Sequence, residues 1–530
     1  MSRRPPIRLM AVLLALAVAV GAIGVGMLRA ALYDPPPAGP VALTGDAILG
    51  RCGGVPTQAT HELRGMWLTT VNNIDFPSRP GLPEAQVKAE YLGWLDLAVA
   101  QRHNAIFVHV RPSGDALWPS AYAPWSEWLT GARDGKGPGW DPMAFMVAEA
   151  HRRNLEFHAW FNPYRGSQPA PAGAGADFKQ LAPNHPLRRH RDWAIAYPKG
   201  KTARLYFDPG NAAARRWVED SILEAVRNYD VDGVHFDDFF YPYPEAGQDF
   251  PDGASFARRT RKAQARADWR RANVDLFVSE MSRRIKQVKP WVKFGISPFG
   301  IWRNAATDKA GSDSRGLQGY DAIYADARRW VREQWLDYVV PQLYWAIGFD
   351  KADYAKMLPW WSALVRGTRV QLYIGQADYR VGEPGPWRDP GQLDRQLTLN
   401  GKYAASGSVH FSAKQVRADP LGAVTRYRIA HYAAPALLPP MAQLPAAPPS
   451  SPRLVSPRSI AGGAVAFDWQ PGAGPAPVSW ALYRVEGPVA KLVATGRSGS
   501  PVSAPRRGIY CLSGLDRSGH EGPPSAPVTV

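Results

Sequence analysis

The segment NAAARRWVEDSILEAVRNYDVDGVHFDD (residues 211–238) joins two structural patterns without a break. Apolar residues recur at helical spacing through 211–230, so this part predicts an amphipathic helix. The run at 233–238 is short and mostly apolar, and it ends in two aspartates, which predicts a buried strand. A helix that leads directly into a buried strand is the repeating unit of α/β folds.

The same alternation continues through the large body of the chain, about residues 60–433. Helix-like segments include 84–103, 143–154 and 270–289. Seven further apolar runs predict strands, at 63–71, 105–112, 155–163, 293–300, 337–345, 370–377 and 407–413. Eight such units predict a (β/α)8 TIM barrel with insertions. An open doubly wound sheet is the alternative, but no G-x-G-x-x-G motif follows any of these strands.

The segments that flank the barrel differ from it in composition. Residues 33–59 and the Pro/Ala-rich stretch 434–452 predict linkers. Residues 453–530 hold short strand-like runs between Gly, Pro and Ser turns, which predicts a small all-β sandwich of the fibronectin type III kind. The two cysteines, Cys52 and Cys511, could form a disulfide in an oxidising compartment or stay free, and their spacing alone does not decide.

The N-terminus predicts export. Residues Leu9–Leu28 are apolar and uncharged, with arginines on both sides. About 20 such residues can span a bilayer, and the flanking arginines place the N-terminus in the cytoplasm. We therefore predict that residues 1–32 anchor the protein in the inner membrane and that the rest lies in the periplasm or cell envelope. Secretion after cleavage of a signal peptide is the alternative.

Charge and composition restrict the partners. The chain carries 63 basic and 46 acidic residues, a net charge of +17. A basic surface suits an anionic partner such as nucleic acid, lipid head groups or an acidic wall polymer. The sequence has no zinc-finger spacing and no ribonucleoprotein motif, so nucleic acid is not expected. No CxxC motif occurs, which excludes the common thiol-metal sites.

Polar side chains gather where the predicted strands end, and this is where TIM barrels hold their active sites. Any one of these residues could be a cap, a turn or a core residue, but an apolar core would not place polar groups at most strand ends. The candidate catalytic residues are Asp237, Asp238 and Asp115. The candidate substrate-binding residues are Asp75, His109, Arg111, Asn162, Arg165, His235, Tyr241, Gln342 and Tyr344.

This combination of carboxylates, amides and aromatic rings suits sugars. Glycoside hydrolysis needs one carboxyl that protonates the leaving oxygen and another that attacks or activates water. Alternation with His235 turns Asp237 inward, so it is the predicted nucleophile or base. Asp238 is its orienter or partner, and Asp115 is the predicted acid. The reserves for the acid are Asp75 and Glu245.

Two family motifs fit this strand in part. The α-amylase pattern D-G-x-R-x-D matches Asp232 to Asp237 with His235 in the arginine place, but the acid of that family, a glutamate at strand five, has no counterpart. The chitinase pattern D-G-x-D-x-D-x-E lacks its glutamate here, because Phe239 stands in that place. The chitinase type of substrate-assisted mechanism is therefore disfavoured.

A larger set of motifs carries a closer resemblance. LRGMWLTTVNNIDFPS, HVRPSGDALWPS, WDPMAFMVAEAHRRNLEFHAWFNPYR, YDVDGVHFDDFFYPYP and FGISPFGIWRN together resemble the glycosyl-hydrolase-like family 10 of bacterial envelope proteins. The resemblance covers about residues 60–433. It implies a TIM barrel, an envelope enzyme, and cleavage of β-1,4 bonds in peptidoglycan glycan strands that lack stem peptides. No cofactor is implied. It also implies a setting among cell-division or envelope proteins. The lipoprotein box of a known relative is missing here.

Two other functions stay open. A non-catalytic glycan-binding protein would explain the missing carboxylates of strands five and six. A metal-dependent polysaccharide deacetylase is suggested by the paired aspartates in HFDD. That chemistry also needs two histidines three residues apart, whereas His185 and His190 have the wrong spacing. No metal is therefore expected.

Overall fold

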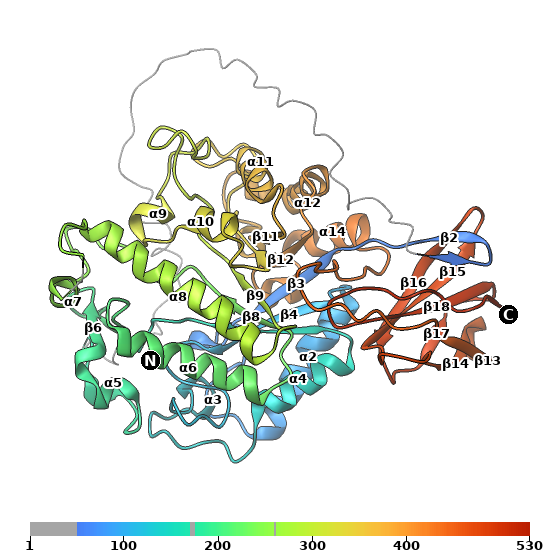
Figure 1. Ribbon diagram of the computed structural model, residues 1–530, viewed down its shortest axis with the longest axis horizontal. Helices are drawn as coiled ribbons and strands as arrows, with labels where there is room; N and C mark the ends of the chain where they lie inside the picture. Colours follow the sequence, from blue (N-terminus) through green and yellow to red (C-terminus); the bar gives the residue numbers. More distant parts are fainter. Residues whose placement is uncertain (1–49, 170–174, 259–260) are drawn as a thin grey trace, which may run out of the picture. The chain divides into compact units, whose positions relative to one another are not determined.

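Eight parallel strands close into a barrel in the order β10-β11-β12-β3-β4-β5-β8-β9 (Figure 1). The computed structural model describes residues 50–169, 175–258 and 261–530. The strands are β3 (Leu63–Leu68), β4 (Ala105–Arg111), β5 (Glu156–Phe161), β8 (Gly233–Phe236), β9 (Lys293–Ile296), β10 (Tyr338–Val339), β11 (Gln371–Gln376) and β12 (Gly407–His410). Each lies within one of the eight predicted runs. The predicted (β/α)8 barrel is confirmed, and the open sheet is wrong because β12 pairs with β3.

Helices follow the strands and cover the outside of the barrel (Figure 1). The four predicted helices are α2 (Glu84–Ala100), α4 (Pro142–Arg152), α6 (Ala212–Asn228) and α8 (Arg266–Val288). The others are α3 (Glu127–Thr130), α5 (Pro186–Arg189), α7 (Gly253–Ala257), α9 (Gly319–Ala322), α10 (Ala327–Arg332), α11 (Tyr354–Val365), α12 (Gln392–Lys402), α13 (Ala413–Ala418) and α14 (Ala423–His431). A short antiparallel pair, β6 (Ala194–Tyr197) and β7 (Arg204–Phe207), lies in the insertion before α6.

Local sequence explains where helices begin. The side chain of Asp141 accepts a hydrogen bond from the backbone N–H of Ala144 at 3.0 Å, and Pro142 occupies the first turn of α4. Asn211 caps α6 in the same way, through the backbone N–H groups of Ala213 and Ala214. Such caps satisfy N–H groups that the first turn of a helix leaves unpaired. They delimit the helix that leads into β8.

Alternation along the strands separates two apolar layers. Inward residues such as Phe107 and Trp160 belong to the cluster that fills the barrel. Their neighbours Val108 and Phe161 belong to the layer between the strands and the helices. The side chains of Met441 and Leu444 join the inner cluster. Part of residues 434–452, predicted as a linker, therefore contributes to the barrel core, because Met441 and Leu444 pack against its inward side chains.

The C-terminal region is a β-sandwich of two sheets. One sheet has the order β1-β2-β16-β15-β18-β19 and the other β13-β14-β17. Apolar residues of both sheets, among them Phe467, Trp480 and Leu512, pack together between them. The strands are β1 (Arg51–Cys52), β2 (Val55–Gln58), β13 (Arg453–Ser459), β14 (Val465–Gln470), β15 (Ser479–Glu486), β16 (Val489–Arg497), β17 (Val502–Ala504), β18 (Ile509–Leu515) and β19 (Val528–Thr529).

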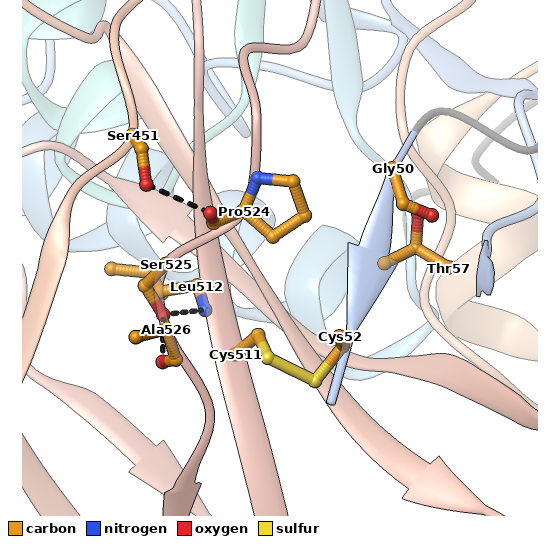
Figure 2. The surroundings of a disulfide bond; sticks show 9 residues. All are labelled: Gly50, Cys52, Thr57, Ser451, Cys511, Leu512, Pro524, Ser525 and Ala526. Atoms are coloured by element: carbon orange, nitrogen blue, oxygen red, sulfur yellow. Dashed lines mark hydrogen bonds between the residues drawn. A yellow bond between two sulfur atoms is a disulfide. The ribbon is translucent and has the colours of Figure 1, made fainter. Parts of the chain in front are cut away.

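The sandwich uses residues from before the barrel. Strand β2 pairs with β16 in parallel, so residues 51–58 belong to a sheet and the linker predicted at 33–59 is wrong there. A disulfide joins Cys52 on β1 to Cys511 on β18, with the two Cα atoms 5.7 Å apart (Figure 2). The structure thus settles the open question of the two cysteines. Sheet pairing brings together residues that are 459 positions apart in the sequence.

The predicted anchor, residues 1–32, lies outside the described residues. Within the ranges described above, no helix combines the length and the hydropathy needed to cross a bilayer.

Candidate active site

Asp237 is the first residue after β8, and its carboxylate lies against the end of β5. It accepts hydrogen bonds from Trp160 Nε1 at 3.2 Å and from Asn162 Nδ2 at 3.2 Å. The backbone N–H of Phe239 donates a third at 3.1 Å. Burial raises the pKa of Asp237 to about 7, Arg165 opposes this rise, and the charge of Asp238 adds to it. A carboxyl with this pKa can give or take a proton near neutral pH.

The carboxylate of Asp238 is held by different residues from those that hold Asp237. Its Oδ1 accepts from Gln342 Nε2 at 3.1 Å, and its Oδ2 accepts from the hydroxyl of Tyr243. Gln342 in turn donates to the backbone oxygen of Ser297 at 2.9 Å. Burial raises the pKa of Asp238, while Tyr243 and Gln342 favour its charged form. Two donors therefore orient this carboxylate and stabilise its charge.

Arg165 supplies positive charge to both carboxylates. Its backbone N–H donates to Asn162 Oδ1 at 3.0 Å, and its guanidinium carbon lies 4.6 Å from the centre of the Phe239 ring. Burial lowers the pKa of Arg165, and Asp237 and Asp238 raise it again. Cation–aromatic stacking holds the guanidinium beside the carboxylates.

His109 and Trp160 form a stacked pair next to Asp237. Their ring centres are 3.9 Å apart and their planes differ by 7°. Burial lowers the pKa of His109 well below its usual range, and Arg165 and His235 lower it further, so the ring is neutral at pH 7. Among the described residues, neither ring nitrogen of His109 has a hydrogen-bond partner. A neutral imidazole can both donate and accept, which suits a sugar hydroxyl.

Half-buried aromatic rings continue along the rim. Ring centres are 5.5 Å apart from Phe239 to Tyr243, 6.2 Å from Tyr243 to Phe299, and 5.6 Å from Phe299 to Trp345. A second group places Tyr344 5.7 Å from Tyr379 and 6.0 Å from Phe411. Of these residues, Tyr344 is the one that the sequence indicated as a substrate-binding residue. Each of the other rings lies at or after the end of a strand. That position in the sequence could have indicated them as candidates for the site.

Residues 62–391 match the family described as glycosyl hydrolase-like 10. The chain belongs to this family. It is 46% identical over 402 residues to "Glycosyl hydrolase YngK" of Bacillus subtilis (strain 168), which covers 75% of this chain and 77% of that protein. It is 38% identical over 372 residues to "Glycosyl hydrolase DigH" of Escherichia coli (strain K12), covering 67% and 83%.

Among solved structures, an alpha-L-fucosidase isoenzyme 2 from Paenibacillus thiaminolyticus is 13% identical with a TM-score of 0.44. That match covers 70% of this chain and 49% of the fucosidase chain, so this chain spans about half of the fucosidase length.

Three predicted residues of this glycosyl hydrolase-like chain lie elsewhere than expected. Arg111 follows a register shift between β4 and β5, which turns its side chain outward to α6. There its Nη1 donates to Ser221 Oγ at 2.6 Å. Tyr241 is 1% exposed and packs on Phe250 and Tyr324 in the outer layer. Arg111 and Tyr241 are therefore not rim residues.

His235 faces the interior, as alternation predicted, but below the rim. Trp67 Nε1 donates to its Nε2 at 3.2 Å, and the hydroxyl of Tyr338 lies 3.3 Å from its Nδ1. Both ring nitrogens are therefore engaged inside the barrel, which suits packing support beneath Asp237 rather than contact with a sugar.

The three residues that the sequence offered as the acid partner of Asp237 have other surroundings. Asp75 accepts from Thr69 N–H, from Ser412 Oγ at 2.6 Å and from Lys414 N–H at 3.0 Å, and so joins the ends of β3 and β12. Asp115 accepts from Ser113 N–H at 2.8 Å, and burial raises its pKa to about 6. Glu245 is exposed on a turn. None of the described hydrogen bonds or ion pairs links these three residues to Asp237 or Asp238.

No metal site emerges in the described ranges, where no group of three or more His, Cys, Asp and Glu side chains is arranged to hold an ion. His185 instead caps α5 and approaches the backbone oxygen of Gly166 at 3.0 Å. The arrangement can therefore transfer a proton through Asp237, hold a fixed carboxylate at Asp238, and present a cation and aromatic rings to a ligand.

Proposed function

We propose that this protein is an exported glycosidase that hydrolyses β-1,4 bonds in peptidoglycan glycan strands lacking stem peptides. The observation that carries the proposal is the pair Asp237 and Asp238 at the C-terminal end of β8, where TIM-barrel enzymes hold their catalytic groups. Burial raises the pKa of Asp237 to about 7, so the proton needed by the leaving oxygen is available near neutral pH.

In this proposal Asp237 is the general acid. The sequence favoured it as nucleophile or base, whereas its raised pKa favours the protonated form. Trp160 and Asn162 orient its carboxyl. Membership of the glycosyl hydrolase-like family supports a polysaccharide substrate, and the half-buried rings from Phe239 to Trp345 would stack on sugar faces.

Peptidoglycan is the proposed polysaccharide because of charge and location. The net charge of +17 suits an anionic polymer, and muramic acid carries a carboxylate in its lactyl group. The disulfide between Cys52 and Cys511 supports an oxidising compartment. We therefore propose a periplasmic or envelope location, with residues 9–28 as an inner-membrane anchor, among envelope or cell-division proteins. Thiol labelling of protein taken directly from cells would test the location, since free thiols at both cysteines would contradict it.

The C-terminal sandwich is proposed to be a fibronectin type III-like domain. Apart from β1 and β2, its strands divide into β13-β14-β17 and β16-β15-β18-β19, which agrees with a sandwich of three and four strands.

The test uses full-length protein in mild detergent and peptide-free glycan strands made with an amidase. We expect new reducing ends and shorter strands with the native chain, and a large loss with Asp237→Asn. The matched control is Asp275→Asn on α8. Asp275 is also buried with a pKa raised to about 6, but it pairs with Trp330 Nε1 at 2.7 Å. Binding without any new reducing ends would favour a non-catalytic glycan-binding protein instead.

A further inference from the structure

We propose that the nucleophile of the reaction is the 2-acetamido group of the sugar itself, and that Asp238 orients this group. The substrate class at the cleaved bond is then restricted to glycosides of 2-acetamido-2-deoxy sugars. This inference rests on the proposed glycosidase function and concerns the same site.

The first support is the number of carboxyls that the rim brings together. Glycosidases that form a covalent enzyme intermediate place two carboxyls on either side of the bond, about 5–5.5 Å apart. Here the two carboxylates are consecutive residues at the end of one strand. Asp75 and Asp115 are held by other loops, and Asp378 pairs with His410 at 2.9 Å in the outer layer. Within the described ranges, no contact brings a third carboxylate to face the pair.

The second support is how Asp238 is held. Each of its oxygens already accepts one hydrogen bond, from Gln342 and from Tyr243. A carboxylate has about four lone-pair positions, so it can still accept an amide N–H. To attack carbon, Asp238 would have to weaken these bonds and leave its position. Asp238 is therefore better suited to fix an acetamido N–H than to form a bond to the sugar.

The proposed steps add up to hydrolysis with retention of the anomeric configuration. The acetamido oxygen attacks the anomeric carbon, the glycosidic C–O bond breaks, and the Asp237 proton goes to the leaving oxygen. The amide becomes an oxazolinium ion, whose N–H Asp238 holds by a charge-assisted hydrogen bond. Water then attacks the anomeric carbon, Asp237 takes the water proton, and the ring C–O bond opens to restore the acetamide.

The chitinase motif did not indicate this mechanism because its glutamate position holds Phe239. That motif places its acid two residues beyond the preceding aspartate. In this chain the two aspartates are consecutive. Asp237 accepts a hydrogen bond from Asn162, just after β5, and Asp238 accepts one from Gln342, just after β10. Two consecutive residues thus fill the two required roles, Asp237 that of proton transfer and Asp238 that of amide orientation.

The decisive experiment varies the substrate and leaves the protein unchanged. Peptide-free glycan strands are enzymatically de-N-acetylated and then re-acylated with acetyl, difluoroacetyl or trifluoroacetyl groups. Fluorine withdraws electrons from the amide oxygen, so we expect kcat to fall on the order of tenfold or more from acetyl to trifluoroacetyl. Equal rates across the series would overturn the inference and leave the glycosidase function intact. Failure to cleave even the re-acetylated strands would instead overturn the proposed function.

A second measurement tests Asp238 directly. Asp238→Ala is assayed with sodium azide, with Asp275→Asn as the matched control. If Asp238 were the nucleophile, azide would take its place and give a glycosyl azide of inverted anomeric configuration. We expect no such product and no rescue. Its detection by mass spectrometry and NMR would contradict the inference.

Discussion

Strand β8 carries a buried aspartate at each end, and the two behave in opposite ways. Asp232 precedes the strand and is 4% exposed, and Asp237 follows it and is 5% exposed. Burial favours the neutral acid at both positions, but His151 holds the pKa of Asp232 below its usual range. The pKa of Asp237 is raised to about 7.

The difference lies in the partners at the two ends of the barrel. Asp232 accepts from His151 Nε2 at 2.7 Å and from Phe157 N–H at 2.8 Å. Beside it, Glu156 pairs with Lys293 at 2.5 Å, and this cation lowers its pKa despite burial. At the other end Asp237 and Asp238 repel each other. With nearly equal burial, the partners therefore lower the pKa at one end and leave it raised at the other, and the raised pKa suits the proton transfer proposed for Asp237.

The largest expected effect is the loss of catalysis in Asp237→Asn. We expect kcat to fall by about 10²–10⁴-fold, because the amide cannot donate the proton. Glycan-strand cleavage followed by reducing-end release measures this, and circular dichroism checks the fold. The control Asp275→Asn should keep native activity. A fully active Asp237→Asn protein would remove Asp237 from the mechanism.

Asp232→Asn should have the converse effect. We expect the free energy of unfolding to fall by about 2–4 kcal/mol, because His151 loses its partner and the buried pair is broken. Denaturant unfolding at pH 7 measures the change. Activity per folded molecule should remain native, and a selective loss of activity would show that the two ends of β8 do not have separate roles.

The pH dependence of stability sharpens the contrast. The pKa of Asp237 is raised to about 7 in the folded state and is about 4 in the unfolded state. Between these two pH values the folded chain keeps a proton on Asp237 that the unfolded chain has already lost. Asp237 therefore destabilises the fold increasingly as pH rises through this window. We expect Asp237→Asn to be more stable than the native chain at pH 8, by about 1–3 kcal/mol, and equal to it near pH 4.

The pKa of Asp232 is lowered, so its contribution is present above pH 4 and is lost as pH falls below that value. The stability deficit of Asp232→Asn should accordingly shrink in acid. Thermal melts from pH 3 to 8 measure both trends, and parallel profiles for the two variants would contradict the comparison.

The smallest expected effect is that of Tyr243→Phe. Removing one hydroxyl donor to Asp238 should lower kcat by about tenfold, since hydrogen bonds to charged groups contribute about 1.5–3 kcal/mol. Asp237, the proposed proton donor, keeps its own hydrogen-bond partners, so the alkaline limb of the pH–rate profile should stay near its native position. A large shift of that limb would show that Tyr243 acts on Asp237 instead.

The eight strands, four of the barrel helices and the inward face of Asp237 could all be predicted from the amino-acid sequence. These features depend on local periodicity, because a period of two or of 3.6 residues assigns each side chain to a face. The sequence also brought Asn162, Arg165 and Gln342 into the candidate site, since strand ends share one rim of the barrel.

Features that depend on contacts between distant segments could be seen in the folded chain alone. A register shift in β4 turned Arg111 away from the rim, and Ser412 drew Asp75 into a structural network. Sheet pairing carried residues 51–58 into the sandwich and closed the disulfide from Cys52 to Cys511. The partners of Asp237 and Asp238 come from β5 and from beyond β10. Whether a buried carboxylate stabilises the fold or carries a proton depends on such partners, and no local pattern records them.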